Sequence, residues 1–126
     1  MKKWIYFLPA LTFYLLIFLL SSSHISVDLD IGHLDKVGHF LEFGLMGFLL
    51  AIGFFNALSV SSSTKFVLTL GSGLILAILD EFHQWFVPFR NSDLKDILAD
   101  AAGLILGILV FRCLAGRKKP AGRSTR

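Results

Sequence analysis

One predicted helical face near residue 40 combines an imidazole with carboxylates. Asp35, His39 and Glu42 are spaced i, i+4 and i+7, so a helix through them presents all three side chains on the same side. A histidine beside carboxylates can support general acid–base or nucleophilic catalysis. We therefore predict that His39 acts as a general base or nucleophile, and that Glu42 is a catalytic partner that orients it or supplies a proton.

Two later segments carry further acids and an amide at helical spacing. Glu81 and Gln84 are three residues apart, and Asp96 and Asp100 are four apart, so each pair shares one face of a helix. We predict that Glu81 and Asp96 belong to the catalytic group, with Glu81 in the same orienting or acid role as Glu42. Gln84 and Asp100 are predicted to bind substrate or complete the polar network.

Two cations adjoin these segments. Lys36 follows Asp35, and Arg90 ends the stretch that begins at Glu81. Arg can bind a phosphate through two parallel N–H donors, whereas Lys binds it as a point charge. Lys36 and Arg90 are therefore predicted to bind a phosphate group of the substrate.

Long apolar stretches must position these groups. With 55% hydrophobic residues and a mean hydropathy of +0.72, the chain has too little polar surface for a soluble domain. Stretches of 19 or 22 residues can cross a hydrocarbon core of about 30 Å at about 1.5 Å per residue. We predict an all-α polytopic membrane protein, with a four-helix transmembrane bundle in residues 1–115 and a basic tail in 116–126. The four apolar stretches cover residues 4–22, 37–58, 66–87 and 96–114.

The basic residues predict the orientation. Of the 12 Lys and Arg residues, all but Lys36, Arg90 and Lys95 lie before the first stretch, between the second and third, or at and beyond the end of the fourth. The positive-inside rule then makes both termini cytoplasmic. Because topology accounts for these charges, the net charge of +3 does not indicate nucleic-acid binding. The first stretch also resembles a signal peptide, but its length and the lack of an alanine-type cleavage site favour a retained anchor.

All nine acidic residues and all four histidines fall on the opposite, outer side. Counted from the outer end of each stretch, the predicted site residues within the stretches lie roughly 3–9 Å inside at 1.5 Å per residue. A lipid's glycerol and phosphate sit at that level, whereas transporters commonly bind substrate near the midplane. The apolar inner halves of the stretches also argue against a transporter. The residues at this depth are His39, Glu42, Glu81, Gln84, Asp96 and Asp100.

Structural roles compete with these assignments. His39 and Glu42 could hydrogen-bond between helices or reach out to the interface. Asp93 is best explained as a favourable charge near the N-terminus of the fourth helix, which Asn91 or Ser92 could cap. For several other acids and histidines, exposure to head groups or water is at least as good an explanation as function. They are Asp80, His83, His24, Asp28, Asp30 and His33.

A metal site is a further alternative. His39 and Glu42, in a His-x-x-Glu arrangement, could present two ligands on one face, with His83 and nearby carboxylates as others. No spacing matches a zinc signature, so we predict no metal. No motif identifies a cofactor or an oligomeric state, and Cys113 is the only cysteine, so an intrachain disulfide is impossible.

Three motifs carry a family resemblance. Residues 35–43 read D-K-V-G-H-F-L-E-F, which resembles the D-K-x-x-H-F opening of VanZ-like proteins. Residues 81–90 are similar to that family's E-x-x-Q-x-F-x-P-x-R segment, and residues 96–103 to its D-x-x-x-N-x-x-G. Asp100 stands where Asn is more usual, which leaves the role of that position in doubt.

The resemblance implies a bacterial inner-membrane protein whose namesake lowers sensitivity to the glycopeptide antibiotic teicoplanin. A wider similarity has been proposed between VanZ-like domains and membrane enzymes that exchange lipid head groups, such as phosphatidylserine synthases. Together with the depth of the polar layer, this favours an enzyme that hydrolyses or transfers phosphate-linked head groups of a membrane lipid or lipid-linked precursor at the outer leaflet. The alternative is a non-enzymatic protein that binds a lipid-linked precursor or a lipophilic glycopeptide.

Overall fold

The computed structural model describes residues 2–23 and 32–117, and these residues contain helices but no strand. A short 3-10 helix, η1 (Lys3–Phe7), leads into α1 (Leu8–Ser22), which is followed by α2 (Gly32–Ala57), α3 (Ser62–Trp85) and α4 (Leu94–Gly116). In the described residues, four helical segments are long and apolar enough to cross a membrane, the first being η1 with α1. The predicted all-α, four-span fold is confirmed.

The second helix begins earlier than its apolar stretch. α2 starts at Gly32, five residues before the apolar run, so Asp35 and Lys36 are helical. An apolar run marks what can lie in hydrocarbon, whereas a helix can continue into the interface, where water satisfies its first N–H groups. His33 is exposed in the first turn of α2. His24, Asp28 and Asp30, and the basic tail beyond Arg117, lie outside the described residues.

Side-chain caps define where the last two helices begin. The hydroxyl of Ser61 accepts a hydrogen bond from the backbone N–H of Thr64 at the start of α3. At the start of α4 the cap is Asp93, whose carboxylate accepts from the backbone N–H of Lys95 at 3.0 Å. The prediction that Asn91 or Ser92 caps this helix is therefore wrong, because Asp93 takes that place itself.

Glycines bring α2 and α4 together, and these two helices make the most extensive contact in the bundle. A Cβ added at Gly107 would collide with the backbone carbonyl of Gly44, and one added at Gly103 would collide with that of Phe40. A Cβ at Gly47 would lie 2.9 Å from the Cα of Leu104. Gly103 and Gly107, four residues apart on α4, therefore let the two helices approach closely.

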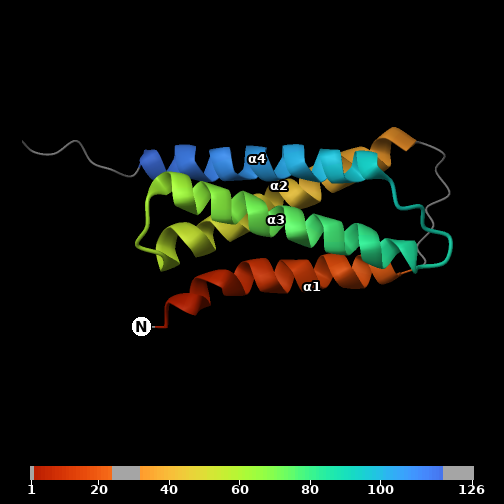
Figure 1. The fold of residues 1–126 in the computed structure, drawn as a ribbon, viewed down its shortest axis with the longest axis horizontal. Coiled ribbons are helices and arrows are strands. Elements are labelled where there is room, and N and C mark those ends of the chain that lie inside the picture. The colour runs from red at the N-terminus through yellow and green to blue at the C-terminus, as the bar shows by residue number, and fades with distance from the viewer. Residues whose placement is uncertain (1, 24–31, 118–126) are drawn as a thin grey trace, which may run out of the picture.

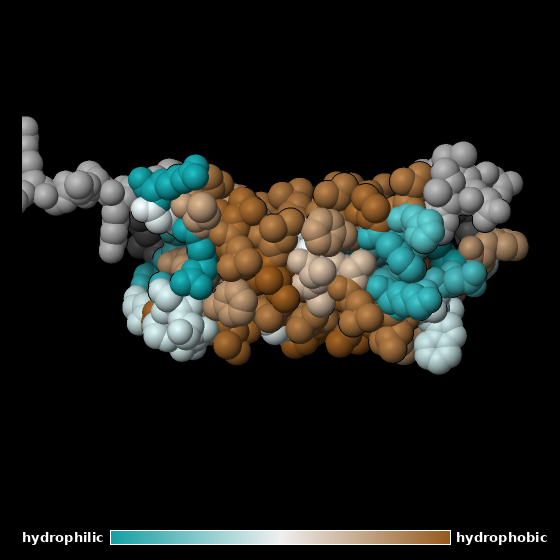
Figure 2. Space-filling model, turned by 90° about the horizontal axis from the view of Figure 1, so that it is seen from above, coloured by the Kyte–Doolittle hydropathy of each residue, from teal (hydrophilic) through white to brown (hydrophobic). Residues whose placement is uncertain are grey.

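The four helices form one bundle, with α4 along one side, α1 along the opposite side and α2 and α3 between them (Figure 1). Helix α1 packs on α2 and α3, where Ile17, Phe43, Met46 and Ala77 belong to the buried apolar core. An apolar belt runs around the middle of the face in Figure 2, with hydrophilic side chains at both ends. The N-terminal helix starts at the end of the bundle where α4 finishes, and the α3–α4 loop lies at the other end (Figure 1).

Candidate functional site

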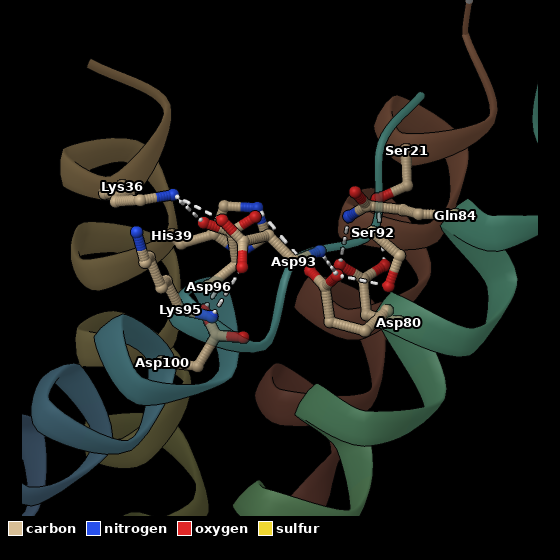
Figure 3. Close-up of polar contacts among 11 residues, drawn as sticks. Ser21, Lys36, His39, Asp80, Gln84, Ser92, Asp93, Lys95, Asp96 and Asp100 are labelled. Atoms are coloured by element: carbon tan, nitrogen blue, oxygen red, sulfur yellow. Dashed lines mark hydrogen bonds and ion pairs between the residues drawn. The ribbon is translucent and has the colours of Figure 1, made fainter. Parts of the chain in front are cut away.

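Buried polar side chains gather at the end of the bundle where α3 joins α4 (Figure 3). The helical spacings in the sequence thus bring the polar faces of three helices to one layer, which holds four carboxylates and an imidazole. None of these five residues is more than 5% exposed. They are His39 on α2, Asp80 and Glu81 on α3, and Asp96 and Asp100 on α4.

His39 is held by Asp100. Its Nδ1 lies 3.0 Å from Oδ1 of Asp100, which has no exposed surface. When Asp100 is ionised it only accepts hydrogen bonds, so Nδ1 must be the donor in this contact, and a neutral ring then keeps its lone pair on Nε2. Nε2 lies 3.8 Å from Oε1 of Glu81, too far for a hydrogen bond. The hydrogen bond that holds the ring is made with Asp100, and the predicted role of Glu42 and Glu81 in orienting the ring or acting as acids stays a prediction.

Glu81 ties α3 to the loop before α4. Its Oε2 accepts hydrogen bonds from the Ser92 hydroxyl at 2.9 Å and from the backbone N–H of Asp93 at 3.2 Å. Its Oε1 is buried and has no hydrogen-bond partner among the described residues. The sequence did not indicate a contact for Ser92, since a loop serine carries no helical spacing to reveal its partner.

Lys36 joins α2 to the start of α4. Its Nζ lies 2.7 Å from Oδ1 of Asp96, which is 1% exposed, and 3.4 Å from Oδ2 of Asp93. The hydrogen bond from the backbone N–H of Lys95, helped by Lys36, lowers the pKa of Asp93 below its usual value. Lys36 therefore neutralises a buried acid, and a substrate phosphate would have to share it.

Replacing Lys36 by methionine should destabilise the bundle, because Asp96 would keep its buried charge without an ion pair. We expect a loss of about 1–3 kcal/mol, less than for a fully buried pair because the Lys36 side chain is 34% exposed. The loss of stability is measured by unfolding the purified protein with SDS and following the unfolding by circular dichroism. Lys95→Met is the matched control, since that side chain is exposed and should change stability by no more than about 0.5 kcal/mol. Equal effects of the two substitutions would contradict the role of Lys36.

Asp80 forms a second cluster with α1. The hydroxyl of Ser21 donates to its Oδ1 at 2.8 Å, and Nε2 of Gln84 donates to its Oδ2 at 2.8 Å. Both carboxylate oxygens are thus satisfied in a residue that is 2% exposed. Sequence reasoning assigned span one only packing and anchoring, and so missed Ser21, because a serine at the end of an apolar run gives no sign of its partner.

His83 lies apart from His39. Its ring is 4.3 Å from that of Phe18, centroid to centroid, and its Nε2 is 2.9 Å from the Ser22 hydroxyl on α1. That hydroxyl also donates to the carbonyl of Phe18 at 2.7 Å. These contacts fit a role in packing α1 onto α3.

A cavity of about 160 Å³ opens beside the imidazole of His39. Predicted site residues from α2, α3 and the α3–α4 loop share its wall with apolar residues of α1. Lys36, Glu81, Asp96 and Asp100 are not among its lining residues. Arg90 also lines a larger, more open hollow of about 540 Å³ with Trp85, Asn91 and Ser92. The cavity is lined by Ile17, Leu20, Ser21, Leu34, Asp35, Gly38, His39, Glu42, Gln84 and Arg90.

Comparison with models of known protein families shows which family the chain belongs to. The model described as VanZ/LLP1 matches residues 2–115, nearly the whole chain. The chain belongs to the VanZ/LLP1 family. The resemblance drawn from the three motifs is thereby confirmed. A search of curated proteins found no match, and a search of solved structures found none either.

In this VanZ/LLP1 protein the three motifs meet in space. The first supplies His39, the second supplies Glu81 and Arg90, and the third supplies Asp96 and Asp100. Contacts between motifs hold them together, since His39 pairs with Asp100 and Lys36 with Asp96. Residues outside the motifs complete the layer: Ser21, Asp80 and Ser92.

Among the residues that the structure describes, two triplets of side chains in the VanZ/LLP1 bundle have the spacing of a metal site. One donor atom each from Asp35, His39 and Asp96 lie within 4.8 Å of one another, and the same is true of His39, Glu81 and Asp100. Asp35 is exposed, so only the second triplet is buried throughout. Neither triplet contains Glu42 or His83, which the sequence offered as ligands alongside His39.

Proposed function

We propose that this multi-pass membrane protein acts on phosphate-linked lipid head groups, by hydrolysis or by transfer to an acceptor alcohol. The observation that carries the proposal is the cavity wall shared by His39 and Arg90. One is an oriented imidazole with a lone pair on Nε2, and the other is a guanidinium suited to a phosphate. The buried acids around them lie at one end of helices long enough to span a bilayer.

The reaction uses groups at the cavity. Arg90 binds the lipid phosphate, and Nε2 of His39 takes the proton of a water or alcohol that attacks phosphorus. Glu42, half-buried on the same wall, returns a proton to the departing head group. Asp100 keeps the Nδ1 proton in place and stabilises the ring when it becomes charged. Lys36 and Asp96 hold α2 against α4, and Gln84 donates to Asp80, which in turn accepts from Ser21 on α1.

The proposed setting is the inner membrane of a bacterium, with both termini in the cytoplasm and the cavity at the outer leaflet. Arg112 and Arg117 at the end of α4, with Lys2, Lys3 and Lys65, support that orientation through the positive-inside rule. A head-group change there would alter lipids or lipid-linked precursors that face the cell wall. A change in teicoplanin sensitivity is one outcome to be measured in cells.

The full chain in nanodiscs tests the proposal. Phosphatidylglycerol, phosphatidylethanolamine and polyprenyl-phosphate lipids are offered in turn, and products are followed by mass spectrometry. Release or exchange of a head group supports the proposal, and no change in any lipid overturns it. Saturable binding of a lipid or of teicoplanin without turnover would instead support the binding protein that the sequence left as the alternative.

Arg90→Ala should raise the KM for the active lipid at least about tenfold, because a charge-assisted phosphate contact contributes about 1.5–3 kcal/mol. Arg90→Lys should recover part of the loss, since it keeps the charge without the paired donors. KM and kcat are measured separately in the nanodisc assay. Arg112→Ala, at the opposite end of the bundle, should leave both unchanged. An unaltered KM in Arg90→Ala would remove Arg90 from the site.

A further inference from the structure

The buried layer holds more carboxyl groups than it has Lys or Arg partners among the described side chains. Lys36 pairs with Asp96, and among the described residues no Lys or Arg forms an ion pair with Asp80, Glu81 or Asp100. Asp80 has both oxygens hydrogen-bonded. Glu81 and Asp100 each keep one buried carboxylate oxygen, Oε1 and Oδ2, without a hydrogen-bond partner in the described structure. A buried carboxylate oxygen without a hydrogen-bond partner costs free energy, so these two atoms are candidates for binding a ligand.

The spacing between Glu81 and His39 suits a metal ion. Oε1 lies 3.8 Å from Nε2, beyond hydrogen-bond length. Two donor atoms that bind one tetrahedral ion with bonds of about 2.0–2.1 Å lie roughly 3.4 Å apart. A shift of the two side chains by a few tenths of an ångström would therefore let both donors bind the same ion. Behind the ring, Asp100 accepts from Nδ1, as the carboxylates that orient metal-binding histidines commonly do.

We propose that Nε2 of His39 and Oε1 of Glu81 bind a divalent cation in the buried layer, behind the part of the cavity wall that His39 forms, with Asp100 as the carboxylate that positions the ring. One imidazole and one carboxylate favour Zn²⁺, which is of borderline character and takes both nitrogen and oxygen ligands, over the hard ions Mg²⁺ and Ca²⁺. This proposal departs from the prediction of no metal, which rested on the lack of a sequence signature. The two donors lie on different helices, 42 positions apart in the sequence, so no local spacing could reveal them.

Cation binding goes beyond the proposed lipid reaction and is measured without it. Nε2 has one lone pair, so a bound ion prevents His39 from taking a proton at the same time. The ion would then serve as the electrophile beside the lipid phosphate, and a base other than His39 would be needed. Metal-loaded and chelated protein should therefore differ in any turnover that is found.

The experiment uses the full chain in detergent, stripped with EDTA and dialysed. Zn²⁺ binding is measured by calorimetry and by metal content after desalting, and Mn²⁺ binding by electron paramagnetic resonance. We expect one ion per chain and a higher melting temperature in its presence. Glu81→Gln keeps an acceptor for Ser92 but loses the charge, and should weaken binding at least about a hundredfold.

Asp80→Asn is the matched control, because Asp80 is the adjacent residue, is equally buried and has both oxygens bonded. It should bind the ion within about threefold of the unchanged protein, well short of the loss expected at a ligand. Wild-type protein that retains no ion and shows no shift in melting temperature would overturn the proposal, even if Glu81→Gln failed to fold. Equal affinity in Glu81→Gln would also overturn it. Metal binding without lipid turnover would leave the cation site standing and remove only the proposed reaction.

Discussion

His39→Asn should lower head-group turnover at least about a hundredfold, the scale of a lost general base or metal ligand. The substitution is selective, because the asparagine amide nitrogen can take the place of Nδ1 and still donate to Asp100. What disappears is Nε2, which faces Glu81 and serves either proposed role. Turnover is measured in nanodiscs by mass spectrometry of lipid products, at saturating lipid so that kcat is compared.

His83→Asn is the matched histidine control. His83 packs on Phe18 and contacts Ser22 rather than the buried acids, so its loss should change turnover no more than about threefold, far less than loss of a catalytic base. If both substitutions lowered kcat equally, the effect would come from helix packing and not from the imidazole of His39. Full activity in His39→Asn would remove His39 from the reaction.

The role of Asp100 in orienting His39 can be tested by substitutions of Asp100. Asn at position 100 keeps an oxygen that accepts from Nδ1, and Asn is the more usual residue in the family motif. Asp100→Asn should therefore retain turnover within about tenfold, whereas Asp100→Leu, which removes the acceptor, should lose at least as much as His39→Asn. Turnover that is retained in Asp100→Asn and lost in Asp100→Leu would show that residue 100 acts by orienting the imidazole ring and that its negative charge is not needed.

Gly107→Ala should destabilise the bundle by more than about 3 kcal/mol. The added Cβ would collide with the carbonyl of Gly44 and come within 2.8 Å of the backbone nitrogen of Phe48. Both obstacles are backbone atoms, so α2 and α4 must move apart to admit the methyl group. SDS-induced unfolding followed by circular dichroism measures the loss, and the same shift should loosen His39 from Asp100.

Gly71→Ala on α3 provides the contrast. A Cβ at Gly71 would meet nothing within 4 Å, and alanine in a helix is favoured over glycine by about 0.5–1 kcal/mol. It should therefore leave stability unchanged or slightly higher. If Gly107→Ala unfolded at the same SDS content as Gly71→Ala, the close α2–α4 contact would not exist in the membrane protein.

The sequence by itself determined the number of spans and the end of the bundle where the buried polar side chains gather. Four apolar runs match the thickness of a bilayer because length and hydropathy alone decide whether a helix can cross it. Helical spacing also placed His39, Glu81 and Asp100 at a common depth, since rise per residue is constant. The family motifs could be recognised for the same reason, as each lies within a few turns of one helix.

Only the tertiary structure decided which side chains touch. Asp80 and Glu81 are neighbours in sequence, yet Asp80 turns to Ser21 on α1 while Glu81 turns to the α3–α4 loop and His39. Consecutive helical residues point about 100° apart, so the rotation of α3 against its neighbours selects their partners. That rotation, like the choice of Asp100 for His39, depends on packing between helices far apart in sequence. Glycine contacts between α2 and α4 bring Asp100 next to His39, and no spacing within one helix reveals this pairing.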